Sequence, residues 1–106
     1  MDVKETPEFR EWLAEQDVGF VNELKRIREH VFIGDSPAIG AYCKPLKNKL
    51  YELIIQFKGD PWRIFFSWEG QHCVILLCGG NKQGKKQMKW YRNQMKIAGG
   101  LMEKYK

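Results

Sequence analysis

The spacing of apolar residues predicts two helices in the first third of the chain. Thr6 followed by Pro7 and an acidic residue is typical of a helix start, and aromatic and leucine side chains then recur every three or four residues. A second apolar stripe begins after Asp17, which fits an N-cap, and ends before a Gly-Asp-Ser-Pro break at 34–37. The two segments together predict a helical hairpin.

Alternation of apolar and polar positions predicts three strands in the second half. Residues 50–58, 62–68 and 72–77 alternate as strands with one buried face do. The turns between them are short, which favours an antiparallel meander. Residues 35–49 are expected to form a loop, and residues 3–5 fit an additional strand at the edge of the sheet.

The last segment, residues 86–105, predicts a C-terminal helix, because apolar side chains recur at helical spacing from Met88 to Met102. Gly99 and Gly100 are expected to weaken it and to divide it. Neither a repeat nor a second domain is indicated, so all 106 residues are expected to form one α+β domain with the order βααβββα. We expect the helices to lie on one face of the sheet and to leave the other face open.

Charge is distributed unevenly along the chain. Residues 1–43 carry five Lys/Arg against nine Asp/Glu, a balance of −4, whereas residues 44–106 carry thirteen against four, a balance of +9. The basic half is suited to a polyanion such as RNA, DNA or a ribosome, although basic charge also serves solubility alone. The sequence contains no apolar run of the ~20 residues that span a bilayer and no signal-peptide pattern, so we expect a soluble, cytoplasmic protein.

Cysteines and histidines do not form a recognisable reactive or metal-binding pattern. Cys43, Cys73 and Cys78 lack metal-ligand spacing and are expected to be reduced thiols. His30 falls at a helix end and His72 at a strand end, which favours structural roles over general-base catalysis. We therefore expect neither a metal nor another cofactor.

A basic cluster is the strongest candidate site. Arg63 falls inside an aromatic-rich strand, and a basic loop follows the third strand. Guanidinium and ammonium groups together stabilise charge that develops on a phosphodiester. In the alternative interpretation, the Arg63 stem packs on aromatic rings and its head pairs with Glu52 across the hairpin. The other cations expected on this surface are Lys47 and Lys49 at its rim and Lys82, Lys85 and Lys86 in the loop.

Three segments resemble the HigB branch of the RelE/ParE toxin superfamily. They are Thr6-Pro-Glu-Phe-Arg-Glu-Trp-Leu13, Lys44-Pro-Leu-Lys-Asn-Lys-Leu-Tyr-Glu-Leu53 and Pro61-Trp-Arg-Ile-Phe-Phe66. The resemblance extends over residues 3–98. It implies the βααβββα fold and a toxin of a type II toxin–antitoxin pair. It also implies an antitoxin partner, often a helix-turn-helix protein, and a target that is mRNA in the ribosome or, in ParE relatives, DNA gyrase.

The resemblance also implies roles for single residues. The family's phosphate-contacting arginine falls on Arg63, and Tyr91 is the candidate aromatic for base stacking. Ile54 stands where the family has a basic residue, and Cys78 stands where it commonly has histidine. The expected catalytic residues are Arg63, Lys82, Lys86 and Tyr91, and the expected RNA-binding residues are Lys47, Lys49, Lys85 and Lys89.

Two functions follow from this set. The first is a ribosome-dependent mRNA endoribonuclease, which the intact Arg63 and the basic cluster favour. The second is a member without ribonuclease activity that binds its antitoxin and another target such as gyrase, which Ile54 and Cys78 favour. In either case we expect the antitoxin to lie over the open sheet or the helical hairpin, to be acidic over Lys82–Lys86 and apolar over exposed aromatics such as Phe65 or Trp90.

Overall fold

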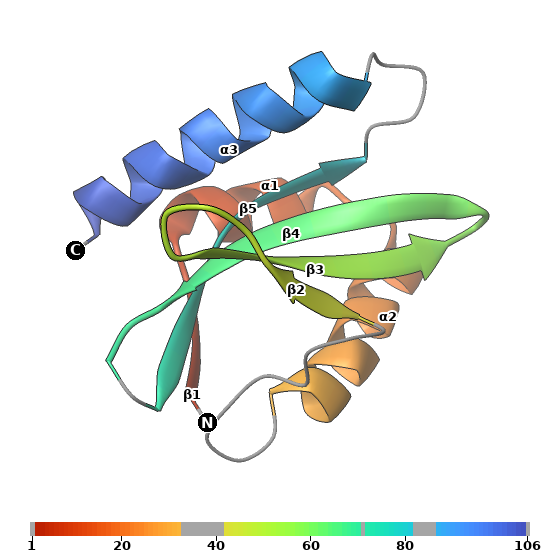
Figure 1. The fold of residues 1–106 in the computed structure, drawn as a ribbon. Helices are drawn as coiled ribbons and strands as arrows, with labels where there is room; N and C mark the ends of the chain where they lie inside the picture. Colours follow the sequence, from red (N-terminus) through yellow and green to blue (C-terminus); the bar gives the residue numbers. More distant parts are fainter. Residues whose placement is uncertain (1, 33–41, 71, 82–86, 106) are drawn as a thin grey trace.

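Five strands and three helices make up the computed structural model, which describes residues 2–32, 42–70, 72–81 and 87–105. The strands form one sheet in the order β1-β5-β4-β3-β2, in which β1 runs parallel to β5 and the other neighbours are antiparallel (Figure 1). The predicted α+β fold and its element order are confirmed, with β2 as an additional short strand. The elements are β1 (Asp2–Glu5), α1 (Pro7–Ala14), α2 (Val18–Val31), β2 (Cys43–Pro45), β3 (Leu50–Phe57), β4 (Asp60–Trp68), β5 (Cys73–Asn81) and α3 (Gln87–Lys104).

The N-terminal helices begin at the predicted caps. The Thr6 hydroxyl accepts a hydrogen bond from the Phe9 N–H at 3.0 Å and donates one to the Leu77 carbonyl at 3.0 Å. The Asp17 carboxylate accepts a hydrogen bond from the Gly19 N–H and begins α2. Thr6 therefore both caps α1 and attaches its start to β5.

Helices cover both faces of the sheet, so the expectation of an open face is wrong. Helices α1 and α2 pack on one face against side chains such as Ile64 and Phe66, and α3 packs on the other against Phe65. The reason is that β3, β4 and β5 carry apolar residues on both faces, which only a second layer removes from water. The α3-side core contains Leu50, Phe65, Leu77, Trp90, Ala98 and Leu101. Phe65 and Trp90, expected as exposed aromatics, are buried at 0% and 7% exposure.

Strand β5 is longer than predicted and contains a bulge. It continues to Asn81 rather than ending at residue 77, and Leu77 is the extra residue between the pairs Phe65–Cys78 and Phe66–Leu76. A Cβ atom on Gly79 would lie 3.0 Å from the Trp12 ring, and one on Gly80 would lie 3.1 Å from the Trp90 ring. The glycines therefore admit close packing of aromatic rings within the strand, beyond the end predicted for it at residue 77.

Two further segments differ from the sequence-based expectation. Residues 43–45, expected in a loop, form β2, because Cys43 is buried and pairs with Leu53. Helix α3 runs without interruption through Gly99 and Gly100. Leu101 beyond them is buried in the core, so tertiary packing outweighs the low helix propensity of the glycines.

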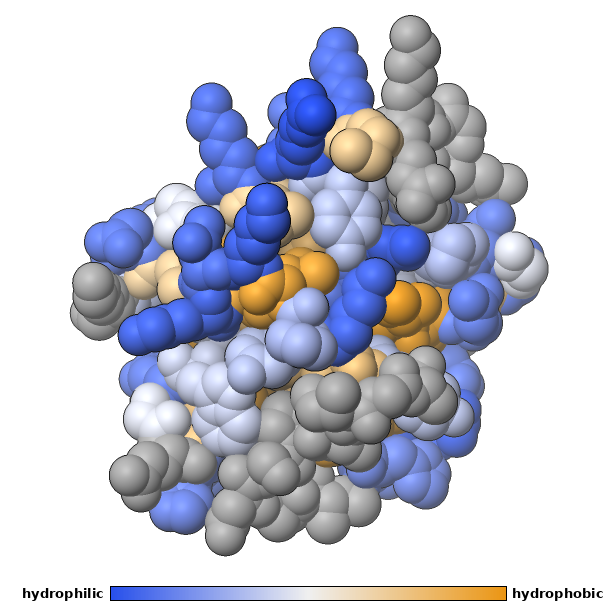
Figure 2. Space-filling model, in the orientation of Figure 1, coloured by the Kyte–Doolittle hydropathy of each residue, from blue (hydrophilic) through white to orange (hydrophobic). Residues whose placement is uncertain are grey.

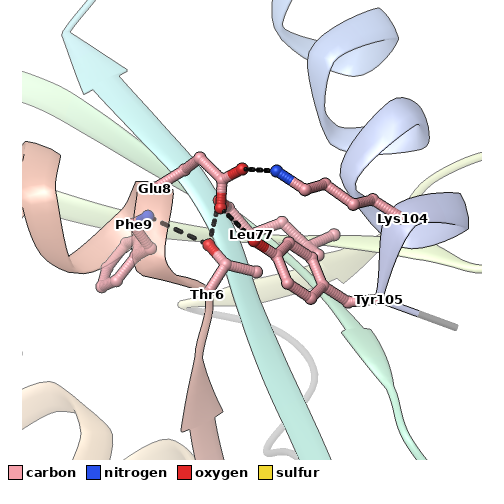
Figure 3. A network of polar contacts seen from close by, with 6 residues as sticks. All are labelled: Thr6, Glu8, Phe9, Leu77, Lys104 and Tyr105. Carbon is pink, nitrogen blue, oxygen red and sulfur yellow. Dashed lines mark hydrogen bonds and ion pairs between the residues drawn. The ribbon is translucent and has the colours of Figure 1, made fainter.

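A polar network joins the end of α3 to the start of α1 (Figure 3). The Glu8 carboxylate accepts hydrogen bonds from Lys104 Nζ at 2.8 Å and from the Tyr105 hydroxyl at 2.7 Å. The Lys104 contact, followed by that of Tyr105, lowers the pKa of Glu8 to about 2. Glu8 thus connects the helix layers on opposite faces of the sheet.

Among the helices that the structure describes, none has the length and apolar character needed to cross a membrane.

Replacement of Glu8 by Gln is expected to remove the part of the stability that depends on this ionised carboxylate. Because the folded-state pKa is depressed, the contribution is complete above about pH 4.5 and is lost as the pH falls towards about 2. The difference in urea midpoint between the wild type and Glu8→Gln should therefore shrink across this interval. The control is Glu11→Gln on the same helix; a wild-type advantage over Glu8→Gln that is independent of pH would contradict the assignment.

Candidate functional site

Arg63 lies in the middle of the sheet on the face that α3 covers. Its neighbours in the ladder are Ile54 on β3 and Gly80 on β5. The residue is 9% exposed, and its Nε lies 3.5 Å from Glu52 Oε1. The alternative drawn from the sequence, in which Arg63 pairs with Glu52 across the hairpin, is therefore confirmed as a contact.

The Arg63 guanidinium has unused hydrogen-bonding capacity. Its Nε and Nη1 atoms are buried and have no hydrogen-bond acceptor among the described residues, because the contact with Glu52 does not have hydrogen-bond geometry. Buried donors of this kind are rare in folded proteins and favour an incoming acceptor. A phosphate oxygen is a suitable acceptor for a planar guanidinium.

Tyr91 of α3 lies against Arg63. The guanidinium carbon is 5.5 Å from the centre of the Tyr91 ring, and the same ring meets Phe65 edge-on with centroids 5.8 Å apart. The Tyr91 hydroxyl is buried without a hydrogen-bond partner in the part of the chain that the structure describes. The fold thus brings together two residues that were predicted separately, 28 positions apart in the chain.

Glu52 is the main acidic group at this site. It is fully buried, and Lys44 Nζ approaches the same Oε1 atom at 3.9 Å that Arg63 approaches. Among the described residues, Lys44 and Arg63 thus both approach this one carboxylate inside the α3-side core. Glu52 was expected only as a possible partner of Arg63, although a glutamate between apolar strand neighbours is itself a signal of a buried charge pair.

The two positions that depart from the family pattern lie next to this centre. Ile54 faces Arg63 across the ladder, and Cys78 pairs with Phe65. Burial raises the pKa of the Cys78 thiol to about 12. At neutral pH neither side chain therefore provides a charge or a proton acceptor to the site.

The predicted lysines are distributed over more than one surface. Lys47 is exposed beside Arg92, whereas Lys49 lines a groove with Met102 and Tyr105 near the other end of α3. Lys89 is exposed on α3, two residues before Tyr91. The predicted site residues Lys82, Lys85 and Lys86 lie outside the described residues. Arg92 was missed, although it follows Tyr91 and lies one helical turn from Lys89.

Within the described ranges, no group of three or more His, Cys, Asp or Glu side chains is arranged to hold a metal ion.

Comparison with known families adds an independent observation. Residues 7–103 match the family described as phage derived protein Gp49-like (DUF891). The chain belongs to the Gp49-like family. This family is of the RelE/HigB toxin type, so the Gp49-like protein is toxin-like, and an antitoxin is its expected partner. None of the curated proteins and none of the solved structures matches the chain.

The thiol at position 78 of this Gp49-like protein is expected to resist alkylation at about pH 8, because the thiolate is the reactive form and its pKa is about 12. Peptide mass spectrometry after iodoacetamide treatment should show modification of Cys73 before Cys78. Both thiols should react at similar rates in urea. Rapid labelling of Cys78 in the folded protein would contradict a partly buried thiol that stays protonated at this pH.

Proposed function

We propose that this Gp49-like protein is a HigB-like toxin of a type II toxin–antitoxin system and that it cleaves mRNA in the ribosome. The observation that carries the proposal is the Arg63 guanidinium, which is buried against Tyr91 and whose Nε and Nη1 atoms have no acceptor among the described residues. The basic second half of the chain supports an RNA target. The proposed antitoxin is a helix-turn-helix protein, and the proposed setting is the cytoplasm, with the whole chain as one toxin domain.

The proposed cleavage reaction does not need a strong general base. The substrate's own 2′-oxygen attacks phosphorus, the bond from phosphorus to the 5′-oxygen breaks, and the 2′-proton passes to solvent while the departing 5′-oxygen gains one. Arg63, with Lys82 and Lys86, stabilises the charge on the phosphate oxygens, and Tyr91 stacks on a neighbouring base. Lys47, Lys49, Lys85 and Lys89 hold the flanking backbone. Positioning and charge stabilisation supply much of the rate in such reactions.

A second function is favoured by a different observation. The Glu52 carboxylate lies 3.5 Å from Arg63, and its negative charge repels an anionic substrate. Ile54 and the protonated Cys78 thiol carry no positive charge that would offset this repulsion. These features suit a member without ribonuclease activity that binds its antitoxin and another target such as DNA gyrase. If the mRNA stays intact in the experiment described next, the result favours this second function over the ribonuclease.

Replacement of Arg63 by Ala is expected to reduce mRNA cleavage by about 100- to 1,000-fold, the range for loss of a main transition-state charge donor. Purified protein is added to a cell-free translation reaction, and new mRNA ends are mapped by primer extension with and without ribosomes. The matched control is Arg10→Ala, which removes an exposed arginine from α1. Ends that appear unchanged with Arg63→Ala would refute the proposed role of Arg63.

Tyr91→Phe and Tyr91→Ala are expected to differ. The phenyl ring keeps the face that lies over Arg63, and loss of a hydroxyl without a partner removes no hydrogen bond to a described residue. Cleavage by Tyr91→Phe should therefore remain within about threefold of wild type, whereas Tyr91→Ala should lose about tenfold or more, consistent with loss of base stacking. Equal losses in both variants would instead assign the function to the hydroxyl.

A further inference from the structure

Four cations on one side of the molecule have no carboxylate partner among the residues that the structure describes. Lys47, Lys89, Arg92 and Lys96 are exposed and form no ion pair or hydrogen bond with any described residue. By contrast, Arg26 pairs with Glu23, Arg28 with Glu5, and Lys58 with Asp17. Exposed Arg10 and Lys25 on α1 and α2 also lack a partner among the described residues; what distinguishes the α3 set is that Lys47 and Arg92 line the same groove.

Three of these cations follow one face of α3. Lys89, Arg92 and Lys96 are three and four residues apart, which places neighbouring Cβ atoms about 5–6 Å from one another. No acidic residue occurs in α3 before Glu103, so no charge on the helix itself neutralises them. Figure 2 shows hydrophilic side chains projecting from the part of the surface that α3 occupies in Figure 1.

A groove separates this face of α3 from the β2–β3 turn. Apolar atoms of Pro45, Leu46 and Met95 line it together with the stems of Lys47 and Arg92. It adjoins the Arg63 centre, because Arg92 follows Tyr91 in the chain and Lys44, which precedes Pro45, lies 3.9 Å from Glu52. An apolar floor with cations at its rim can receive one base by van der Waals contact, in place of the aromatic stacking of other RNA-binding sites, while the cations contact the adjoining phosphates.

We propose that this groove is a nucleotide subsite for single-stranded RNA, next to the cleavage site. The base lies on Pro45, Leu46 and Met95, Lys47 and Arg92 contact its phosphates, and Lys89 and Lys96 contact the phosphates on either side. The choice of RNA as ligand rests on the proposed function. RNA is favoured over an acidic protein segment because Lys89, Arg92 and Lys96 are regularly spaced along one face of α3, as backbone phosphates are along a strand, and Arg92 directly follows Tyr91 in the chain.

The test is fluorescence anisotropy with a short, labelled single-stranded RNA whose riboses are 2′-O-methylated, so that it binds without being cleaved. The double variant Lys47→Ala/Arg92→Ala should bind about tenfold more weakly, and its salt slope should fall by about 1.4, corresponding to two lost phosphate contacts. The matched control is Arg10→Ala/Lys25→Ala, which removes two exposed cations from α1 and α2. Wild-type affinity in the Lys47/Arg92 variant, or an equal loss in the control, would overturn the subsite.

Two further readouts separate the possible causes of failure. Polyglutamate of matched length should displace the RNA only weakly; equal displacement would identify an acidic-protein site and overturn the proposal. The cleavage assay on the wild type is evaluated independently. Weaker binding by the Lys47/Arg92 variant together with intact mRNA would support the subsite and refute the ribonuclease, whereas cleavage with unchanged binding would refute the subsite alone.

Discussion

The charge pair between Glu52 and Arg63, enclosed between the sheet and α3, is the constraint on which the rest of the structure depends. Removing two ions from water costs several kcal/mol for each ion, and a contact of 3.5 Å without hydrogen-bond geometry offsets only part of this cost. The packing of Phe65, Trp90 and Leu101 has to stabilise the helix above the pair. Glu8 holds the far end of that helix through Lys104 and Tyr105, so α3 is attached at the end away from the site.

The burial of Arg63 also strengthens the electrostatic interaction that we propose between its guanidinium and a phosphate. A guanidinium in a site of low effective dielectric interacts more strongly with a phosphate than an exposed lysine does. The Tyr91 ring restricts the orientation of the Arg63 guanidinium. The Nε and Nη1 atoms, which lack an acceptor among the described residues, can donate hydrogen bonds to a bound ligand. Ile54 and Cys78 provide neither the basic residue nor the imidazole that the HigB resemblance implies at these positions, which suits the proposed reaction because it is governed by positioning and charge.

Local signals in the sequence predicted most of the fold. Thr6 and Asp17 fixed the starts of two helices, and the alternating strands predicted the meander and the place of Arg63 within it. The covered second face was missed because Phe65, on the same side of its strand as Arg63, was expected to be exposed. A phenylalanine beside Arg63 on that side was the available signal for a second layer. The bulge at Leu77 and the contact between Arg63 and Tyr91 depend on pairing between distant segments, which no local pattern encodes.

The most direct test of the account is the chemical identity of the RNA ends produced in the ribosome reaction. Attack by the 2′-oxygen leaves a 2′,3′-cyclic phosphate, or the 3′-phosphate formed by its hydrolysis, upstream of the break and a 5′-hydroxyl downstream. Mass spectrometry of the fragments should show this pair of ends, in agreement with cleavage that relies on charge stabilisation by Arg63. Fragments with 3′-hydroxyl and 5′-phosphate ends, or mRNA that stays intact, would contradict the account.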